Sequence, residues 1–225
     1  MSSIAFTGPV KDVAAARAFA GEVNGARRGD FVESRKRLAI TKERIFLVEG
    51  TPMGAAVMVY SEGLNAGLQM ARLRVSSNAF DKFYLASVAR MSAVDVANMP
   101  PGPPPHLVFE WAAGRTAKAC TMIAAPVPEP AKFWALCRDM TARYVEHGES
   151  RSRVGATLER AFYLHDARMA VVYLEGDDPM AAMEKSMHSD AGSDRWFTEQ
   201  ISAVHGIDFR AHKPPTPELL ISYDA

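Results

Sequence analysis

The sequence predicts an α+β fold made of two similar halves in tandem. The phrase Glu-Ser-Arg-x-Arg begins at Glu33 and occurs again at Glu149, 116 residues further along the chain. The phrase Tyr-x-Glu-Gly begins at Tyr60 and again at Tyr173, at a spacing of 113 residues. The chain has 225 residues, which is close to twice either spacing. A repeat at nearly constant spacing indicates that one structural unit is written twice.

Each half shows the same order of predicted elements. Short runs rich in aliphatic and aromatic residues predict strands, and apolar residues spaced three and four apart predict helices. A first strand leads into a helix that carries Phe19 in the first half and Phe133 in the second. Two strands follow, and then a helix that carries Tyr84 or Phe197. The predicted strands cover 3–7, 44–48, 57–61, 94–96 and 107–111, and in the second half 121–125, 160–164, 170–174, 207–209 and 219–223.

Strand, helix, strand, strand, helix, strand is the order of a ferredoxin-like unit. Such a sheet has helices on one face, and its other face needs a cover, for which a second identical sheet is suited. We therefore predict two tandem ferredoxin-like repeats, residues 1–112 and 113–225, packed as one unit into an intramolecular pseudo-dimeric α+β barrel.

The order of elements, the duplication and two phrases carry a family resemblance. The phrases are VVYLEGDDP from Val171 and SDRWFTEQISAVHGIDF from Ser193. The chain resembles the dimeric α+β barrel superfamily, and within it a tandem-duplicated group of bacterial proteins of unassigned function. That superfamily includes antibiotic-biosynthesis monooxygenases, EthD-like and NIPSNAP-like proteins, and haem-binding chlorite dismutase-like proteins. The resemblance implies a barrel but no particular chemistry, since one fold supports many functions.

The repeated charged phrase has two interpretations. Glu33 and Arg37 are four residues apart, as are Glu149 and Arg153, so an acid and a base share one helix face. The favoured interpretation is a charged helix end that leads into an edge strand, with Gly155 ending the helix in the second half. The alternative is an arginine cluster that binds a carboxylate or a phosphate.

Other charged and aromatic residues also occur in both halves. Because side chains alternate along a strand, Tyr60 and Glu62 share one face, as do Tyr173 and Glu175. Arg44 and Arg160 lie on the preceding strand of each half. If these faces point into the barrel, the side chains meet in a pocket. If they do not, the same side chains form a buried hydrogen-bonded network, which is the favoured interpretation.

The two halves differ in their histidines. Of six histidines, none precedes His106, and His147, His165, His188, His205 and His212 all lie in the second half. Histidine is the usual general acid or base near neutral pH. We therefore expect any pocket to lie in the second repeat, with Tyr173, His205 and His188 as candidate catalytic residues. The candidate binding residues are Arg160, Glu175, Trp196, Arg44 and Tyr60.

Composition excludes several classes of protein. Lys plus Arg and Asp plus Glu both count 26, so no net charge favours nucleic acid. No apolar run is long enough to span a bilayer, and the start does not have the pattern of a signal peptide. The two cysteines, Cys120 and Cys137, lack metal-like spacing, so we expect no metal site and two unreactive thiols. We expect a cytoplasmic protein, and a homo-oligomer stays open.

Three functions compete, and the sequence does not establish that the protein is an enzyme. The first is a barrel that binds a small apolar or aromatic molecule, with cofactor-independent chemistry. There Arg160 would orient an anionic group, Tyr173 or a histidine would move a proton, and Trp196 would wall the pocket. The second is a non-catalytic scaffold or protein-interaction protein with a filled interior. The third is a haem-binding barrel with one histidine of the second repeat as the axial ligand; otherwise no cofactor is expected.

Overall fold

The structure is a computed structural model that describes residues 1–51, 54–93 and 103–225. The chain divides into two compact units. The first unit comprises Met1–Pro104 together with Pro217–Ala225, and the second unit comprises Pro105–Thr216. The second unit is therefore continuous in sequence, whereas the first unit is completed by a segment from the far end of the chain.

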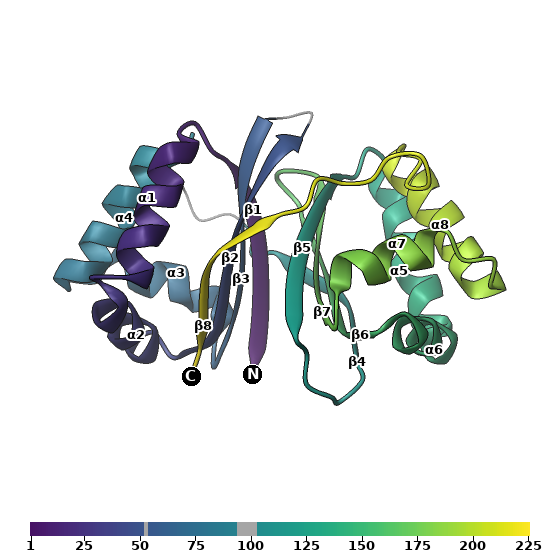
Figure 1. The fold of residues 1–225 in the computed structure, drawn as a ribbon, viewed down its shortest axis with the longest axis horizontal. Coiled ribbons are helices and arrows are strands. Elements are labelled where there is room, and N and C mark those ends of the chain that lie inside the picture. The colour runs from purple at the N-terminus through teal and green to yellow at the C-terminus, as the bar shows by residue number, and fades with distance from the viewer. Residues whose placement is uncertain (52–53, 94–102) are drawn as a thin grey trace. The chain divides into compact units, whose positions relative to one another are not determined.

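The first unit contains one four-stranded antiparallel sheet in the order β1-β3-β2-β8. Four helices, α1 to α4, lie on one face of this sheet (Figure 1). The elements are β1 (Ser2–Pro9), α1 (Val13–Asn24), α2 (Arg28–Arg37), β2 (Ile40–Thr51), β3 (Gly54–Gly63), α3 (Ala66–Arg74), α4 (Ala79–Met91) and β8 (Glu218–Asp224).

The second unit has the matching sheet, in the order β5-β7-β6-β4 and also antiparallel. Its helices α5 to α8 again lie on one face of the sheet (Figure 1). The elements are β4 (His106–Ala112), β5 (Ala119–Pro126), α5 (Pro130–Ala142), α6 (Tyr144–Val154), β6 (Ala156–Leu164), β7 (Met169–Gly176), α7 (Pro179–Met187) and α8 (Gly192–His205).

The predicted fold class is confirmed, as an α+β chain with two four-stranded antiparallel sheets. The last strand of each sequence repeat, however, completes the sheet of the other repeat. Strand β4 pairs with β6, and strand β8 pairs with β2. The compact units thus differ from the predicted repeats, 1–112 and 113–225, by the exchange of one strand each. The duplication itself stays a prediction from the sequence.

Each unit has its apolar core between its sheet and its helices. In the first unit Phe19 and Val23 of α1 pack with Tyr84 of α4 and with Ile221 of β8. In the second unit Phe133 and Leu136 of α5 occupy the corresponding place, and Phe109 of β4 joins them. Side chains at helical spacing of three and four form these cores, as the sequence predicted.

The repeated phrase fastens a helix to a strand and to another helix. In the first unit Arg35 donates from Nε to Glu43 on β2 at 2.7 Å, and the Ser34 hydroxyl donates to Asp81 at 2.5 Å. Arg37 donates to the other oxygen of Asp81 at 2.7 Å. In the second unit Ser150, Arg151 and Arg153 make the corresponding bonds to Asp194, Glu159 and Asp194. In both units the repeated phrase therefore has a structural role, because its side chains join one helix to a strand and to a second helix.

Three local expectations need correction, and a fourth falls outside the described residues. Arg37 and Arg153 pair with an aspartate of a distant helix rather than with the glutamate four residues before them. The strand that follows the phrase is interior, since β2 lies between β3 and β8 and β6 lies between β7 and β4. The predicted strand at 207–209 is a turn, and the one at 94–96 lies outside the described residues.

No helix within the described ranges is long and apolar enough to cross a membrane.

Candidate functional site

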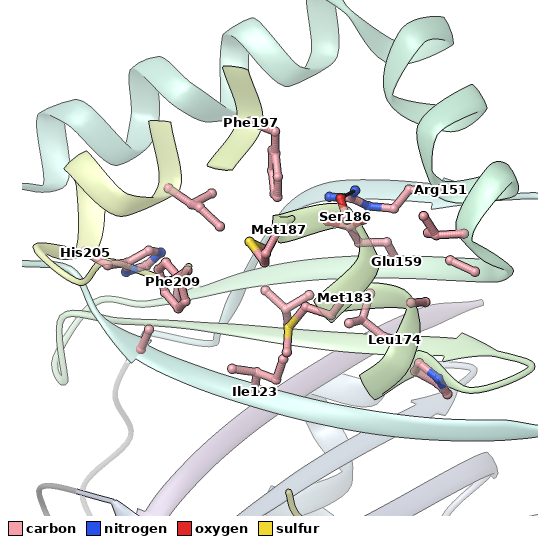
Figure 2. A pocket seen from close by; sticks show the side chains of 18 residues that line it. Ile123, Arg151, Glu159, Leu174, Met183, Ser186, Met187, Phe197, His205 and Phe209 are labelled. Atoms are coloured by element: carbon pink, nitrogen blue, oxygen red, sulfur yellow. Dashed lines mark hydrogen bonds and ion pairs between the residues drawn. The ribbon is translucent and has the colours of Figure 1, made fainter. Parts of the chain in front are cut away.

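The second unit contains an apolar cavity of about 110 Å³ between its sheet and helices α7 and α8. The floor is formed by alternate residues of the strands, among them Ile123 of β5 and Val172 and Leu174 of β7. Met183 and Met187 of α7 and Phe197 of α8 cover the floor from the helix side. Figure 2 shows the two methionines between the two ends of the cavity. A cavity so lined suits an apolar ligand.

One end of the cavity is polar (Figure 2). Glu159 accepts a hydrogen bond from Arg151 Nε. His147 Nε2 lies 3.0 Å from the same carboxylate oxygen. Arg151 Nη1 also donates to the Ser186 hydroxyl at 3.0 Å. Burial raises the pKa of Glu159, but Arg151 and His147 outweigh burial and hold this pKa well below its usual range. The end therefore carries a fixed ion pair, and its two charges compensate each other.

His205 and Phe209 form the opposite end (Figure 2). His205 is the last residue of α8, and its Nδ1 lies 2.6 Å from the Pro126 carbonyl oxygen. Because a carbonyl only accepts, this contact places the ring proton on Nδ1 and leaves a lone pair on Nε2. Burial lowers the pKa of His205 from 6.5, and the bond to Pro126 opposes this only in part. At neutral pH His205 is therefore a neutral imidazole with a basic Nε2.

Three predicted residues lie on the other face of the same sheet. The cavity is lined by Ala170, Val172 and Leu174 of β7, so alternation turns Tyr173 and Glu175 away from it. The Tyr173 hydroxyl donates to Glu175 at 2.6 Å. Arg160, paired with Tyr173 in the ladder, donates from Nε to Glu110 of β4.

The first unit repeats this arrangement at Arg44 and Tyr60. Arg44 pairs with Tyr60 in the ladder, and the Tyr60 hydroxyl donates to Glu62 at 2.6 Å. Arg44 Nη2 donates to both carboxylate oxygens of Asp224 at 2.8 Å. These hydrogen bonds lie within each unit, and the choice between a pocket and a buried network stays a prediction.

Trp196 and His188 do not line the cavity. Trp196 lies under the guanidinium of Arg143, whose Cζ is 4.6 Å from the ring centroid. The neighbouring Phe197 faces the cavity instead. His188 caps the end of α7 and is exposed. Of the three candidate catalytic residues, the structure thus brings His205 alone to the cavity.

Sequence reasoning missed most of the lining. Met183 and Met187 are four residues apart, so they share one helix face, and that face covers the cavity. The open volume itself results from alanines at 125, 156, 170 and 182, and an alanine in a strand or helix gives no signal of an adjacent cavity. Glu159 and Arg151 were recognisable as repeated residues, but nothing in the sequence placed them beside a cavity.

Neither metal nor thiol chemistry is supported at this site. Within the described ranges, no group of three or more His, Cys, Asp and Glu side chains is placed to hold a metal ion. Cys137 is buried in the core of the second unit, and burial raises the pKa of its thiol to about 11. A thiol with this pKa is almost fully protonated at neutral pH and is a poor nucleophile.

Comparison with known proteins supports the fold and no specific family. No family model matches the chain, and no curated protein sequence matches it. A crystal structure of a candidate monooxygenase from Fusobacterium nucleatum is 9% identical, with a TM-score of 0.56 over 99% of this chain and 93% of that one. An anthrone oxidase-like protein, also 9% identical, has a TM-score of 0.52 over 99% and 92% of the two chains. A candidate monooxygenase from Lactobacillus acidophilus has the same identity and TM-score over 100% and 97%. At this level of identity the likeness supports the fold alone.

Proposed function

We propose that the chain binds a small apolar or aromatic molecule in the cavity of the second unit and removes a proton from it without a cofactor. The observation that carries the proposal is the position of His205. Its Nδ1–H is held by Pro126, so the lone pair of Nε2 belongs to a residue at one end of a mostly apolar cavity. A neutral imidazole in such a place is suited to act as a general base.

The reaction follows from the state of His205. The substrate would carry an acidic C–H or O–H group, whose proton passes to Nε2 while the electron pair stays on the substrate. The bond from Nδ1 to Pro126 would hold the ring in one orientation throughout.

The proposal assigns no haem to this cavity. A cavity of 150 Å³ holds a benzene molecule, and the cavity here, at about 110 Å³, is smaller than that. A haem macrocycle is several times larger than benzene and does not fit without displacing α7. A purely structural role predicted a filled interior, so the open cavity in the second unit favours ligand binding over a scaffold.

Proton exchange tests the proposal directly. The protein would be incubated in D₂O with a panel of small aromatic and enolisable compounds, and the loss of exchangeable C–H signals followed by NMR. We expect the wild-type chain to accelerate exchange in at least one compound and His205→Asn to abolish the acceleration. Asparagine retains a donor for Pro126 but has no basic nitrogen.

His188→Asn is the matched control, because His188 is exposed and outside the cavity. This variant should exchange at the wild-type rate. Equal loss in both variants, or unchanged exchange in His205→Asn, would contradict the proposal.

A further inference from the structure

Three of the alanines lining the cavity have larger counterparts in the first unit. Strand register aligns Ala156 with Ile40, since Ala156 pairs with Gly176 as Ile40 pairs with Gly63. Ala170 corresponds to Val57, because each precedes the repeated tyrosine by three residues. Ala182 corresponds to Gln69, the fourth residue of α7 and of α3 respectively. The second unit thus has open volume where the first unit has side-chain atoms.

The counterparts in the first unit are packed into the space between sheet and helices. Ile40 belongs to the apolar core of that unit, and Val57 is partly buried and packs against it. Gln69 is 6% exposed, and its Oε1 accepts a hydrogen bond from the Ser61 hydroxyl at 2.8 Å. Ser61 stands where the second unit has Leu174, a residue of the cavity floor. A polar pair therefore occupies in one unit the place that is apolar and open in the other.

The charges around the cavity limit the ligand further. Arg151 and Glu159 compensate each other at one end, and burial keeps His205 neutral at the other. A ligand that carried its own charge would lose hydration without gaining an unpaired partner. The cavity therefore favours a neutral molecule.

We propose that Ala156, Ala170 and Ala182 determine the specificity of the cavity, and that its ligand is a neutral molecule whose buried part is a single apolar ring. This inference rests on the proposed binding site and adds its ligand class. The volume of about 110 Å³ is below the roughly 150 Å³ of a cavity that holds benzene, so one ring fits only with a small adjustment of the lining and two rings do not fit. Met183 and Met187 have flexible side chains that adjust the shape around such a ring.

Binding of fluorobenzene, followed by ¹⁹F NMR, tests the inference on the full chain. We expect saturable binding of fluorobenzene, with no binding of the charged fluorobenzoate or of the two-ring fluoronaphthalene. Ala170→Val adds two methyl groups inside the cavity and should weaken fluorobenzene binding by at least about tenfold. Ala142→Val makes the same change on the exposed end of α5 and should leave binding unchanged.

An enlarged cavity gives a result that misfolding cannot imitate. Met187→Ala removes a lining side chain and should allow fluoronaphthalene to bind. Unchanged fluorobenzene binding in Ala170→Val, or failure of Met187→Ala to admit fluoronaphthalene, would overturn the inference.

The two proposals fail separately. Suppose that ligand binding changes as predicted in Ala170→Val and Met187→Ala, but His205→Asn does not alter proton exchange. The ligand class would then stand, and His205 would have no catalytic role. Exchange that needs His205 in a chain that does not bind fluorobenzene would do the reverse.

Discussion

Two buried arginines, Arg35 and Arg151, show what the repeated charges do in the folded chain. Arg35 is 1% exposed, and its Cζ lies 4.4 Å from the ring centroids of both Phe31 and Tyr84. Arg151 lies 4.5 Å from the ring of Phe197. Each guanidinium thus sits among aromatic rings and needs its glutamate to balance the charge. One difference between these two clusters is that His147 stands in the place of Phe31, and its Nε2 lies 3.0 Å from Glu159, the glutamate that pairs with Arg151.

Removing one of these glutamates should be costly. We expect Glu159→Gln to lower the free energy of unfolding by about 3–5 kcal/mol, because Arg151 would stay buried without a counter-charge. Urea unfolding of the full chain measures the change. Glu149→Gln, at an exposed position of α6, is the control and should change stability by less than about 0.5 kcal/mol. Equal effects of the two substitutions would show that the ion pair does not stabilise the unit.

The same ion pair makes stability depend on acid. The pKa of Glu159 is lowered on folding from its usual 4.5, so the unfolded chain binds the proton more readily than the folded chain does. The stabilisation is then complete above pH 4.5 and is lost as the pH falls towards the lowered folded pKa. Unfolding of the wild type and of Glu159→Gln between pH 7 and pH 3 checks this. The stability difference between them should shrink as the pH falls, and a constant difference would contradict the linkage.

His205 gives a second pH dependence, this time of activity. Burial lowers its pKa below 6.5, so the basic form persists in mildly acidic solution. The exchange rate with a neutral substrate should therefore stay constant as the pH falls to 6.5 and decline only below it. A midpoint above 6.5 would show that a different group acts as the base.

At the scale of the elements, a residue in the left-handed backbone conformation comes after each of the helices α2 and α6, and the residue differs between them. Gly155 directly follows α6 at φ 92°, and Ala39 follows α2 after one intervening residue, Leu38, at φ 55°. Both angles lie in the left-handed region, which costs a residue with a Cβ about 1 kcal/mol and costs glycine almost nothing. The second unit thus has the favourable residue at this position, and the first unit does not.

Exchanging the two residues should have opposite effects. We expect Ala39→Gly to stabilise the chain and Gly155→Ala to destabilise it, each by about 1 kcal/mol. At Gly155 an added Cβ would lie 3.7 Å from Asp177 Oδ2, an ordinary contact, so backbone conformation is the main cause of the loss. Thermal unfolding of both variants provides the measurement, and shifts of the same sign would refute the explanation.

Local sequence patterns predicted where the strands lie along the chain better than they predicted which strands pair. Alternation and apolar runs predicted β1, β2 and β3 and their counterparts, because burial on a sheet leaves a period of two in the sequence. The segment 207–209 has the same alternation but forms a turn, in which the Asp208 carboxylate accepts from the backbone N–H groups of Arg210 and Ala211. That local hydrogen bonding outweighed strand propensity.

The candidate site was predictable only in part. The unequal distribution of histidines favoured the second repeat and included His205, which does line the cavity. Side-chain chemistry singled out Tyr173 and Arg160 as candidates. The face of the sheet on which a side chain lies, however, depends on the arrangement of all the strands. The alanines carry no pattern of their own, since a cavity is defined by the atoms that are missing from it.

At the scale of the whole molecule, the exchange of β4 and β8 decides which residues stabilise which unit. Ile221 of β8 is 1% exposed in the core of the first unit, and Phe109 of β4 is 5% exposed in the core of the second. Ile221 belongs to the last strand of the second sequence repeat, and Phe109 belongs to the last strand of the first. No local pattern encodes this, because both possible partners of each strand have similar sequences.

Amide hydrogen exchange, measured on two variants of the full chain, tests whether β8 stabilises the first unit and β4 the second. Ile221→Ala should cost about 2–5 kcal/mol and Phe109→Ala about 3–5 kcal/mol. We expect the first substitution to accelerate amide exchange in β1, β2 and β3, and the second to accelerate it in β5, β6 and β7. The opposite assignment would mean that each repeat keeps its own last strand.

The strand exchange also bears on how the chain folds during synthesis on the ribosome. The second unit is complete once residue 216 has emerged, because all of its strands and helices are contiguous. The first unit, although it is translated earlier, lacks β8 until residues 218–224 have been made. Until then the hydrogen-bonding edge of β2 has no partner strand, and an unpaired edge of this kind invites pairing with other nascent chains. The half that is made first is thus the half that finishes last.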